Sequence, residues 1–320
     1  MISARSHARR DSVFATLDAV GDAWSWLILR EAILHDVRRF NELRAHLGIA
    51  RETLRARLDQ LVAGGLLEHR PRPVPGSFAE YLLTECGRDF FICLATAQRW
   101  GRRWYPSDRE REPAARHLHC GGRFEAVLSC SACNQPLEPR SVTVRLAPGA
   151  RKEFRSSTPR GSTRNREPGL KLLERERACS IARTLQIIGD RWTGLTIRES
   201  FLGTRRFDDF ERQMGIAPNI LAQRLGRLVE AGVVARHPYQ DRPLRHEYRL
   251  TKKGLDLYPV PLAMLTFGDR WLVAGRPTLL LSHRSCGRRF AAVLTCGRCA
   301  EPVRREDIAF PPVPLLRKTA

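Results

Sequence analysis

The sequence contains an internal repeat, with two copies of about 140 residues each. The copies align as ATLDAVGDAWSWLILRE (15–31) with RTLQIIGDRWTGLTIRE (183–199), RRFNELRAHLGIARETLRARLDQLVAGGLLEHR (38–70) with RRFDDFERQMGIAPNILAQRLGRLVEAGVVARH (205–237), EYLLTECG (80–87) with EYRLTKKG (247–254), and RFEAVLSCSACNQPLEP (123–139) with RFAAVLTCGRCAEPVRR (289–305). A repeat of this length predicts two similar structural units.

Each copy begins with helical periodicity. In the first copy, apolar residues three and four apart predict helices before and after Gly21, a short helix ending at Gly48 and a further helix over 51–64. Two strands then form a hairpin over 66–84, and a long helix over 85–103 closes the unit. The second copy predicts the same order, with a helix over 218–231, a hairpin over 233–251 and a final helix over 252–271. This is the order of a winged helix-turn-helix.

Three segments of the second copy carry a closer resemblance. GDRWTGLTIRE, RRFDDFERQMGIAPNILAQRLGRLVEAGVV and EYRLTKKG resemble the HxlR family of bacterial winged helix transcription regulators, over about 100 residues in each half. The resemblance implies a sequence-specific regulator that binds double-stranded DNA. Family members usually carry one such domain and act as homodimers that meet through terminal helices, whereas this chain is similar to two fused protomers. We therefore expect a monomeric pseudo-dimer rather than a homodimer, with Trp100 and Trp104 against Phe267 and Trp271.

The net positive charge of the chain favours a polyanionic binding partner. The 320 residues include 55 Lys and Arg against 34 Asp and Glu, a net charge of +21. The sequence shows neither an apolar run long enough for a membrane span nor a secretory signal pattern, which predicts a cytoplasmic protein without a membrane partner. Phosphate-binding loops and hydrolase motifs are missing, so we expect no enzymatic activity.

Candidate DNA contacts lie on the exposed faces of the recognition-type helices and on the wings. Buried leucines leave another face of each helix for base edges and phosphates. Arg57 and Arg224 precede such leucines and are interpreted as structural partners of an acidic residue. The predicted contacts are Arg51, Glu52 and Arg55 in the first helix, Asn219, Gln223 and Arg227 in the second, and Arg70, Arg72, Arg242 and Arg245 in the wings.

The second chemical feature is a His-x2-Cys-x9-Cys-x2-Cys pattern that occurs once in each half. Two x2 knuckles suit one tetrahedral zinc ion, and the intervening residues read as strands, so each half is expected to hold one structural zinc in a short ribbon. The ligands predicted within the first half are His117, Cys120, Cys130 and Cys133, and those within the second half are His283, Cys286, Cys296 and Cys299.

The fold expected from these patterns is mainly α with small β, as two winged helix-turn-helix domains, each followed by a zinc-ribbon-like segment. The predicted bounds are 1–108 and 177–275 for the winged helices, 114–147 and 277–310 for the ribbons, 148–176 for a basic flexible linker and 311–320 for a tail.

Two other interpretations stay open. The Cys-x2-Cys pairs suit a dithiol redox protein, and the ribbons suit an adaptor that binds protein. Cys179, ahead of the first helix of the second copy, stands where many members of the resembled family carry a Cys, some of which sense oxidants. Arg177 and Arg183 would favour its thiolate, so it is a possible redox sensor; the first copy has Ser12 near the same place. The sequence indicates no effector.

Overall fold

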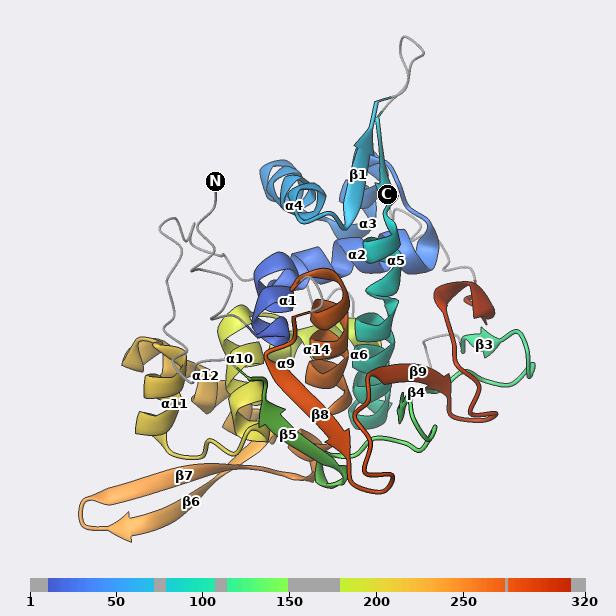
Figure 1. Cartoon of the computed structure of the whole chain (residues 1–320). Helices are drawn as coiled ribbons and strands as arrows, with labels where there is room; N and C mark the ends of the chain where they lie inside the picture. Colours follow the sequence, from blue (N-terminus) through green and yellow to red (C-terminus); the bar gives the residue numbers. More distant parts are fainter. Residues whose placement is uncertain (1–10, 72–78, 107–113, 149–178, 274–275, 312–320) are drawn as a thin grey trace.

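The computed structural model describes residues 11–71, 79–106, 114–148, 179–273 and 276–311 (Figure 1). The first half contains α1 (Ser12–Val20), α2 (Ala23–His35), α3 (Phe40–Leu47), α4 (Arg51–Ala63), β1 (Leu67–Arg70), β2 (Glu80–Leu83), α5 (Glu85–Asp89), α6 (Phe91–Trp104), β3 (Arg116–His117), β4 (Ala126–Cys130), the short 3-10 helix η2 (Pro139–Ser141) and β5 (Val142–Leu146). The predicted linker falls outside these residues except for Pro148, and the predicted tail except for Pro311.

The second half repeats the order of the first. It contains α9 (Ser180–Ile188), α10 (Arg191–Phe201), α11 (Phe207–Met214), α12 (Pro218–Glu230), β6 (Val234–Asp241), β7 (Leu244–Leu250), α13 (Lys252–Leu255), α14 (Pro259–Trp271), β8 (Leu279–His283), β9 (Ala292–Cys296), the 3-10 helix η3 (Arg305–Asp307) and β10 (Ile308–Ala309). The predicted fold class is confirmed. In the described ranges, every helix is too short or too polar to cross a membrane.

Each winged helix is built around one apolar stripe. Helices α3 and α11 end at Gly48 and Gly215, whose φ angles of 59° and 60° are the left-handed conformation that a helix-turn-helix break requires. The next helix then turns its leucines inward. Leu54, Leu58 and Leu61 of α4, and Leu221, Leu225 and Leu228 of α12, are all fully buried.

The wings are antiparallel hairpins of different length. Strands β1 and β2 pair over four residues, whereas β6 and β7 form a ribbon that runs from Val234 to Leu250. The two hairpins project from different ends of the molecule, β1 upward and β6–β7 to the lower left in Figure 1.

The closing helix of each winged helix is broken, which the periodicity did not predict. Instead of single helices over 85–103 and 252–271, a short first segment ends before Phe90 or Tyr258 and a longer one follows. In the second half the longer helix starts on Pro259, which lacks the N–H that an interior helical position needs.

Helices from both halves form the contact between the winged helices. Helix α1 packs on α14, α6 packs on α9, and α6 and α14 pack on each other. Hydroxyl groups link the helices: Thr16 Oγ1 donates to the carbonyl of Met264 at 2.8 Å, and Thr184 Oγ1 donates to that of Ala97 at 2.7 Å. The predicted use of the final helices as an interface therefore agrees with the structure.

The predicted aromatic pairing across this interface is wrong. Trp100 Nε1 donates to the carbonyl of Lys253, Trp104 Nε1 donates to Asp256, and Trp271 Nε1 donates to Asp89. The ring that faces Phe267 is Phe90, with centroids 5.3 Å apart. The physical reason is the crossing direction: each final helix lies beside the start, not the end, of the other.

The ribbon strands follow each winged helix along the chain and are joined to each other. Strand β4 pairs with β9, β5 pairs with β8, and β3 pairs with β10, so every one of these pairs takes one strand from each half. The paired ribbons lie against the final helices, with β4 on α6 and β9 on α14.

Candidate metal centres and nucleic-acid interface

Four tight turns present the predicted metal ligands. In each turn an amide hydrogen bond closes back onto the first ligand residue: Gly121 donates to His117, Asn134 to Cys130, Gly287 to His283 and Ala300 to Cys296, at 2.8–2.9 Å. The donor residue in each turn has a positive φ between 56° and 69°. Such a turn holds both ligands of an x2 pair on one side of the loop.

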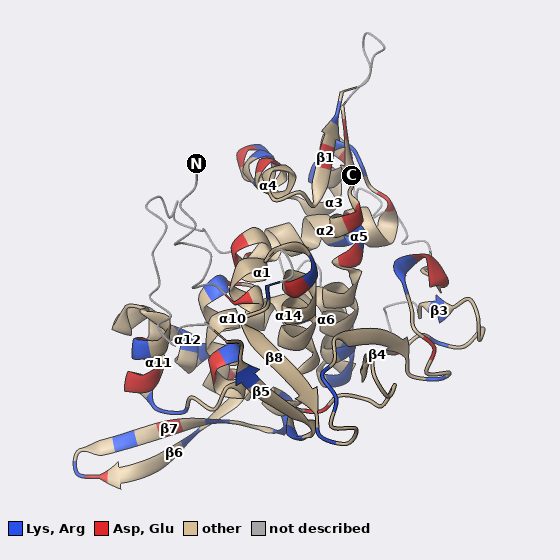
Figure 2. Cartoon of the chain, in the orientation of Figure 1, with Lys and Arg blue, Asp and Glu red and all other residues tan. Residues whose placement is uncertain are grey.

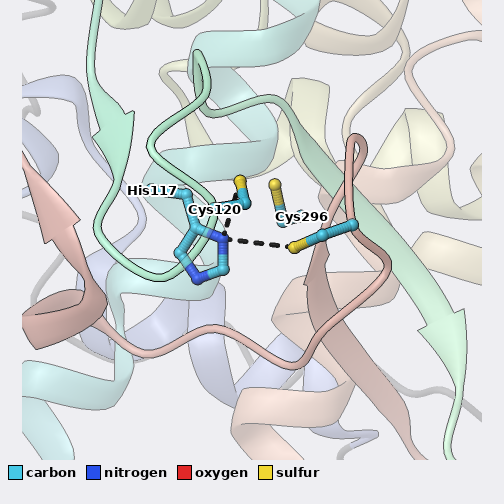
Figure 3. Close-up of side chains that lie close together, drawn as sticks. His117, Cys120 and Cys296 are labelled. Atoms are coloured by element: carbon cyan, nitrogen blue, oxygen red, sulfur yellow. Dashed lines mark hydrogen bonds between the residues drawn. The ribbon is translucent and has the colours of Figure 1, made fainter.

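The first cluster is formed by His117, Cys120, Cys296 and Cys299. Figure 3 shows His117 and Cys120 reaching the cluster from the first half and Cys296 from the second. His117 Nδ1 lies 3.4 Å from Cys120 Sγ and 3.3 Å from Cys299 Sγ. The His117 ring is buried.

The second cluster is formed by Cys130, Cys133, His283 and Cys286. His283 Nδ1 lies 3.2 Å from Cys133 Sγ and 3.7 Å from Cys286 Sγ, and Cys130 Sγ lies 3.9 Å from Cys286 Sγ. Tetrahedral zinc requires S···S separations of about 3.8 Å and S···N separations of about 3.6 Å. The measured separations are close to these values, and the four donor atoms of each cluster all lie within 4.8 Å of one another, so either cluster could hold a metal ion.

The predicted division of the ligands between the clusters is wrong. All eight residues take part, but each cluster combines the His-x2-Cys knuckle of one half with the Cys-x2-Cys knuckle of the other. The cause is the pairing of β4 with β9, in which Ala126 lies opposite Cys296 and Cys130 opposite Ala292. This register brings each Cys-x2-Cys turn to the other half's histidine.

Two further cysteines stand apart from the clusters. Cys86 and Cys93 are buried in the core of the first winged helix. Burial raises the pKa of the Cys86 thiol to about 11 and that of Cys93 well above its usual value. Both are therefore neutral packing residues near pH 7.

The polar face of α12 is exposed, as predicted. Asn219, Gln223 and Arg227 are exposed, on the side away from the buried leucines. Arg224 Nε donates to Asp190 at 2.9 Å, and its Nη1 donates to the side-chain oxygen of Gln223, also at 2.9 Å. In the first half Arg57 pairs with Asp22 at 2.9 Å. The prediction that Arg57 and Arg224 are structural partners of acidic residues is confirmed.

The wing of the second half ends in an exposed basic tip. Arg242 and Arg245 are exposed, one at the turn and the other beside it in β7. Closer to the domain, the guanidinium of Arg206 lies 4.5 Å from the ring centre of Tyr239 and stacks on β6. The tip therefore places two cations far from the core.

The first half offers a more mixed surface. Arg51, Glu52 and Arg55 are exposed on α4, and Figure 2 shows both charge signs along this helix. Arg70 is exposed at the end of β1, with Glu68 Oε1 3.3 Å from its Nη2. Arg72 lies outside the described residues.

Cys179 lies at a contact between the two halves that the sequence pattern did not predict. It precedes α9 as Asp11 precedes α1, so Asp11, and not Ser12, is its counterpart. The buried guanidinium of Arg198 pairs with Asp11, and the buried guanidinium of Arg30 donates through Nη1 to Cys179 Sγ at 3.1 Å. The sequence feature that could have revealed this contact is the Arg-Glu pair at 30–31, which is repeated at 198–199.

Comparison with known proteins gives the same family for both halves. The family model described as HxlR-like helix-turn-helix matches residues 19–109 and 187–275, together more than half of the chain. An HTH-type transcriptional regulator of Mycobacterium tuberculosis is 39% identical over 136 residues, which cover 42% of this chain and 86% of the relative. The regulator YdeP of Bacillus subtilis is 33% identical over 110 residues, covering 34% of this chain and 86% of YdeP.

A solved Pseudomonas aeruginosa structure described as a transcription factor is 38% identical, covering 42% of this chain and 93% of that chain, with a TM-score of 0.33. Each of these three proteins is matched over most of its own length by less than half of this chain. The chain belongs to the HxlR-like helix-turn-helix family and carries two copies of the family domain.

Proposed function

We propose that this chain is a sequence-specific transcriptional regulator whose two winged helices read double-stranded DNA together. The observation that carries the proposal is that the polar face of α12 and the basic tip of the β6–β7 wing of the same domain are both exposed. A helix face of this kind fits the major groove, and cations on a wing reach phosphates or the minor groove. Membership of a transcription regulator family supports the same function.

The chemistry of α12 favours particular base contacts. Because Gln223 accepts a hydrogen bond from Arg224 through its oxygen, its NH2 group is left as the outward donor. A donor there suits the N7 acceptors of purines, and Arg227 suits guanine. Arg224 acts as a positioning residue, since Asp190 holds its guanidinium.

Substitutions in α12 and in the wing should have different effects. Gln223→Ala or Arg227→Ala should relax base preference, with a loss of about 1–3 kcal/mol for a residue that makes a bidentate base contact. Arg242→Ala or Arg245→Ala should weaken binding to all sequences and flatten its salt dependence. Fluorescence anisotropy with specific and random duplexes over a salt series measures both. If all four variants kept the affinity, the specificity and the salt slope of the parent, the second winged helix would not read DNA.

Both clusters are proposed to hold structural zinc, two ions per chain. The distances among the donor atoms support this, and four protein ligands per cluster leave no coordination position for an activated water. Metal analysis of the purified protein separates this proposal from the dithiol alternative: about two zinc ions per chain support it, and none supports a redox protein. An adaptor that binds protein through the ribbons would keep the zinc and fail to shift DNA in a gel.

Cys179 is proposed as an oxidant-sensitive position. The Arg30 guanidinium at 3.1 Å favours the thiolate, which attacks hydrogen peroxide to give a sulfenic acid while the peroxide is reduced to water. Oxidation would remove the thiolate beside the buried Arg30 guanidinium at the contact between the halves, leaving Glu31 as the anionic partner of Arg30. We expect peroxide to weaken DNA binding of the parent and not of Cys179→Asp, which copies Asp11. Equal loss in both proteins would exclude this role.

The two winged helices are proposed to act as an intramolecular pair, with no second chain. The contact through α1, α6, α9 and α14 and the two shared clusters support this assembly. Because α4 presents Arg51, Glu52 and Arg55 where α12 presents Asn219, Gln223 and Arg227, the DNA site should have two unlike half-sites. They should lie about one helical turn apart.

A further inference from the structure

The end of the second ribbon lies on the first winged helix. After Cys299 the chain passes through η3 into β10, where Ile308 lies opposite His117 and Ala309 opposite Arg116. The amide of Leu118 also donates to the carbonyl of Asp307 at 2.8 Å. A ligand of the first cluster, His117, is therefore the strand partner of this C-terminal segment.

This segment delivers one side chain to the end of α2. Arg305 Nε donates to the carbonyl of Ile33 at 2.7 Å, and Nη2 donates to that of Leu34 at 3.3 Å. These carbonyls lie in the last turn of α2, where the helix has no N–H group that could donate to them. A guanidinium there also opposes the negative end of the helix dipole.

Packing holds Arg305 in this place. Its Nη1 donates to the carbonyl of Ile308 at 2.9 Å, and its guanidinium carbon lies 4.6 Å from the ring centre of Phe310. Phe310 in turn makes an edge contact with Phe91 of α6. Ile308 is buried and pairs with His117 of the first ribbon. The cap therefore depends on the position of the whole segment.

The two ribbons differ at the position of this arginine. In the repeat, the first ribbon has Pro139 where the second has Arg305. Proline offers no side-chain donor, so position 139 cannot cap a helix of the second winged helix in this way. Only one of the two family domains is tied to a cluster through an arginine at this position.

We infer that the first cluster, when it holds zinc, sets the position of the first winged helix through Arg305, and that metal occupancy thereby regulates its half of the DNA site. The inference rests on the proposed function for its DNA consequence. The helix-turn-helix of that half begins immediately after α2, with α3 starting at Phe40. Loss of the metal frees the Cys296–Cys299 knuckle from His117, which releases β10 and withdraws the guanidinium from α2.

Hydrogen exchange tests the coupling without DNA. In the full chain, Arg305→Ala should speed amide exchange over residues 33–37 about tenfold, as expected for losing hydrogen bonds from a charged donor. It should leave zinc content unchanged. Removing zinc from the parent with a chelator should give the same acceleration at 33–37. The matched control is Arg304→Ala, which removes the same charge from an exposed neighbour and should leave these amides unaffected.

DNA binding is the second test of the inference. Arg305→Ala should lower affinity for a duplex carrying the intact half-site of the first winged helix severalfold, and should not affect a duplex in which that half-site is scrambled. Unchanged exchange at 33–37 after both Arg305→Ala and zinc removal would overturn the coupling. Faster exchange with no DNA binding by any variant would instead refute the proposed function and leave the coupling standing.

Discussion

A chain that carries Cys120→Ser and Cys130→Ser together should retain no zinc after dialysis against a competing chelator. Both substitutions lie in the first half, but they remove one thiolate from each cluster, because Cys120 belongs to the first cluster and Cys130 to the second. A structural zinc site that loses one of its four protein ligands binds far more weakly. Metal analysis of the purified protein by mass spectrometry gives the count directly.

The matched variant carries Cys120→Ser and Cys299→Ser. These residues come from different halves and the same cluster, so about one zinc should remain. Sites confined to one half would reverse the two results, with one zinc left in the first variant and none in the second. The pair therefore distinguishes the two arrangements even if serine lowers stability in both. Cys296→Ser with Cys299→Ser should also lose one zinc, and with it the cluster that His117 completes.

Gly101→Ala and Gly268→Ala should each destabilise the contact between the halves. A Cβ atom at Gly101 would lie 2.0 Å from the carbonyl oxygen of Ser180, and one at Gly268 would lie 2.2 Å from that of Ser12. Both obstacles are backbone atoms of the other half, so the crossing helices must move apart. Overpacking typically costs about 1–3 kcal/mol, and we expect about 3 kcal/mol at each site.

Equilibrium unfolding in urea measures this loss. Gly226→Ala in α12 is the control, since a Cβ there meets no heavy atom within 4 Å. A mid-helix alanine should be neutral or stabilising by about 0.5–1 kcal/mol. Stabilities of the Gly101 and Gly268 variants equal to that of the control would contradict the close crossing of α6 with α9 and of α1 with α14.

Repetition made much of the fold predictable. Apolar spacing located the buried stripes Leu54–Leu58–Leu61 and Leu221–Leu225–Leu228, and left the polar face of α12 outside. The break before Pro259 was missed because periodicity continues across it. Which face of a helix is buried depends on residues three and four positions apart along the chain, so the sequence alone can predict it.

Contacts between the halves could not be predicted in the same way. Both copies carry the same ligand spacing, so a cluster within one half and a cluster shared between halves satisfy the pattern equally. The choice depends on β4 pairing with β9, which no local spacing reveals. Arg305 and Asp11 were missed for the same reason, since their partners Ile33 and Arg198 are far away in the sequence.

In the function we propose, one chain reads a DNA site with both of its winged helices. The most direct test is selection of bound sequences from random double-stranded DNA, followed by mass measurement of the selected complex by light scattering. We expect one chain of 36.4 kDa per duplex, on a site with two unlike half-sites about one helical turn apart. Two chains bound to a perfect palindrome would contradict it.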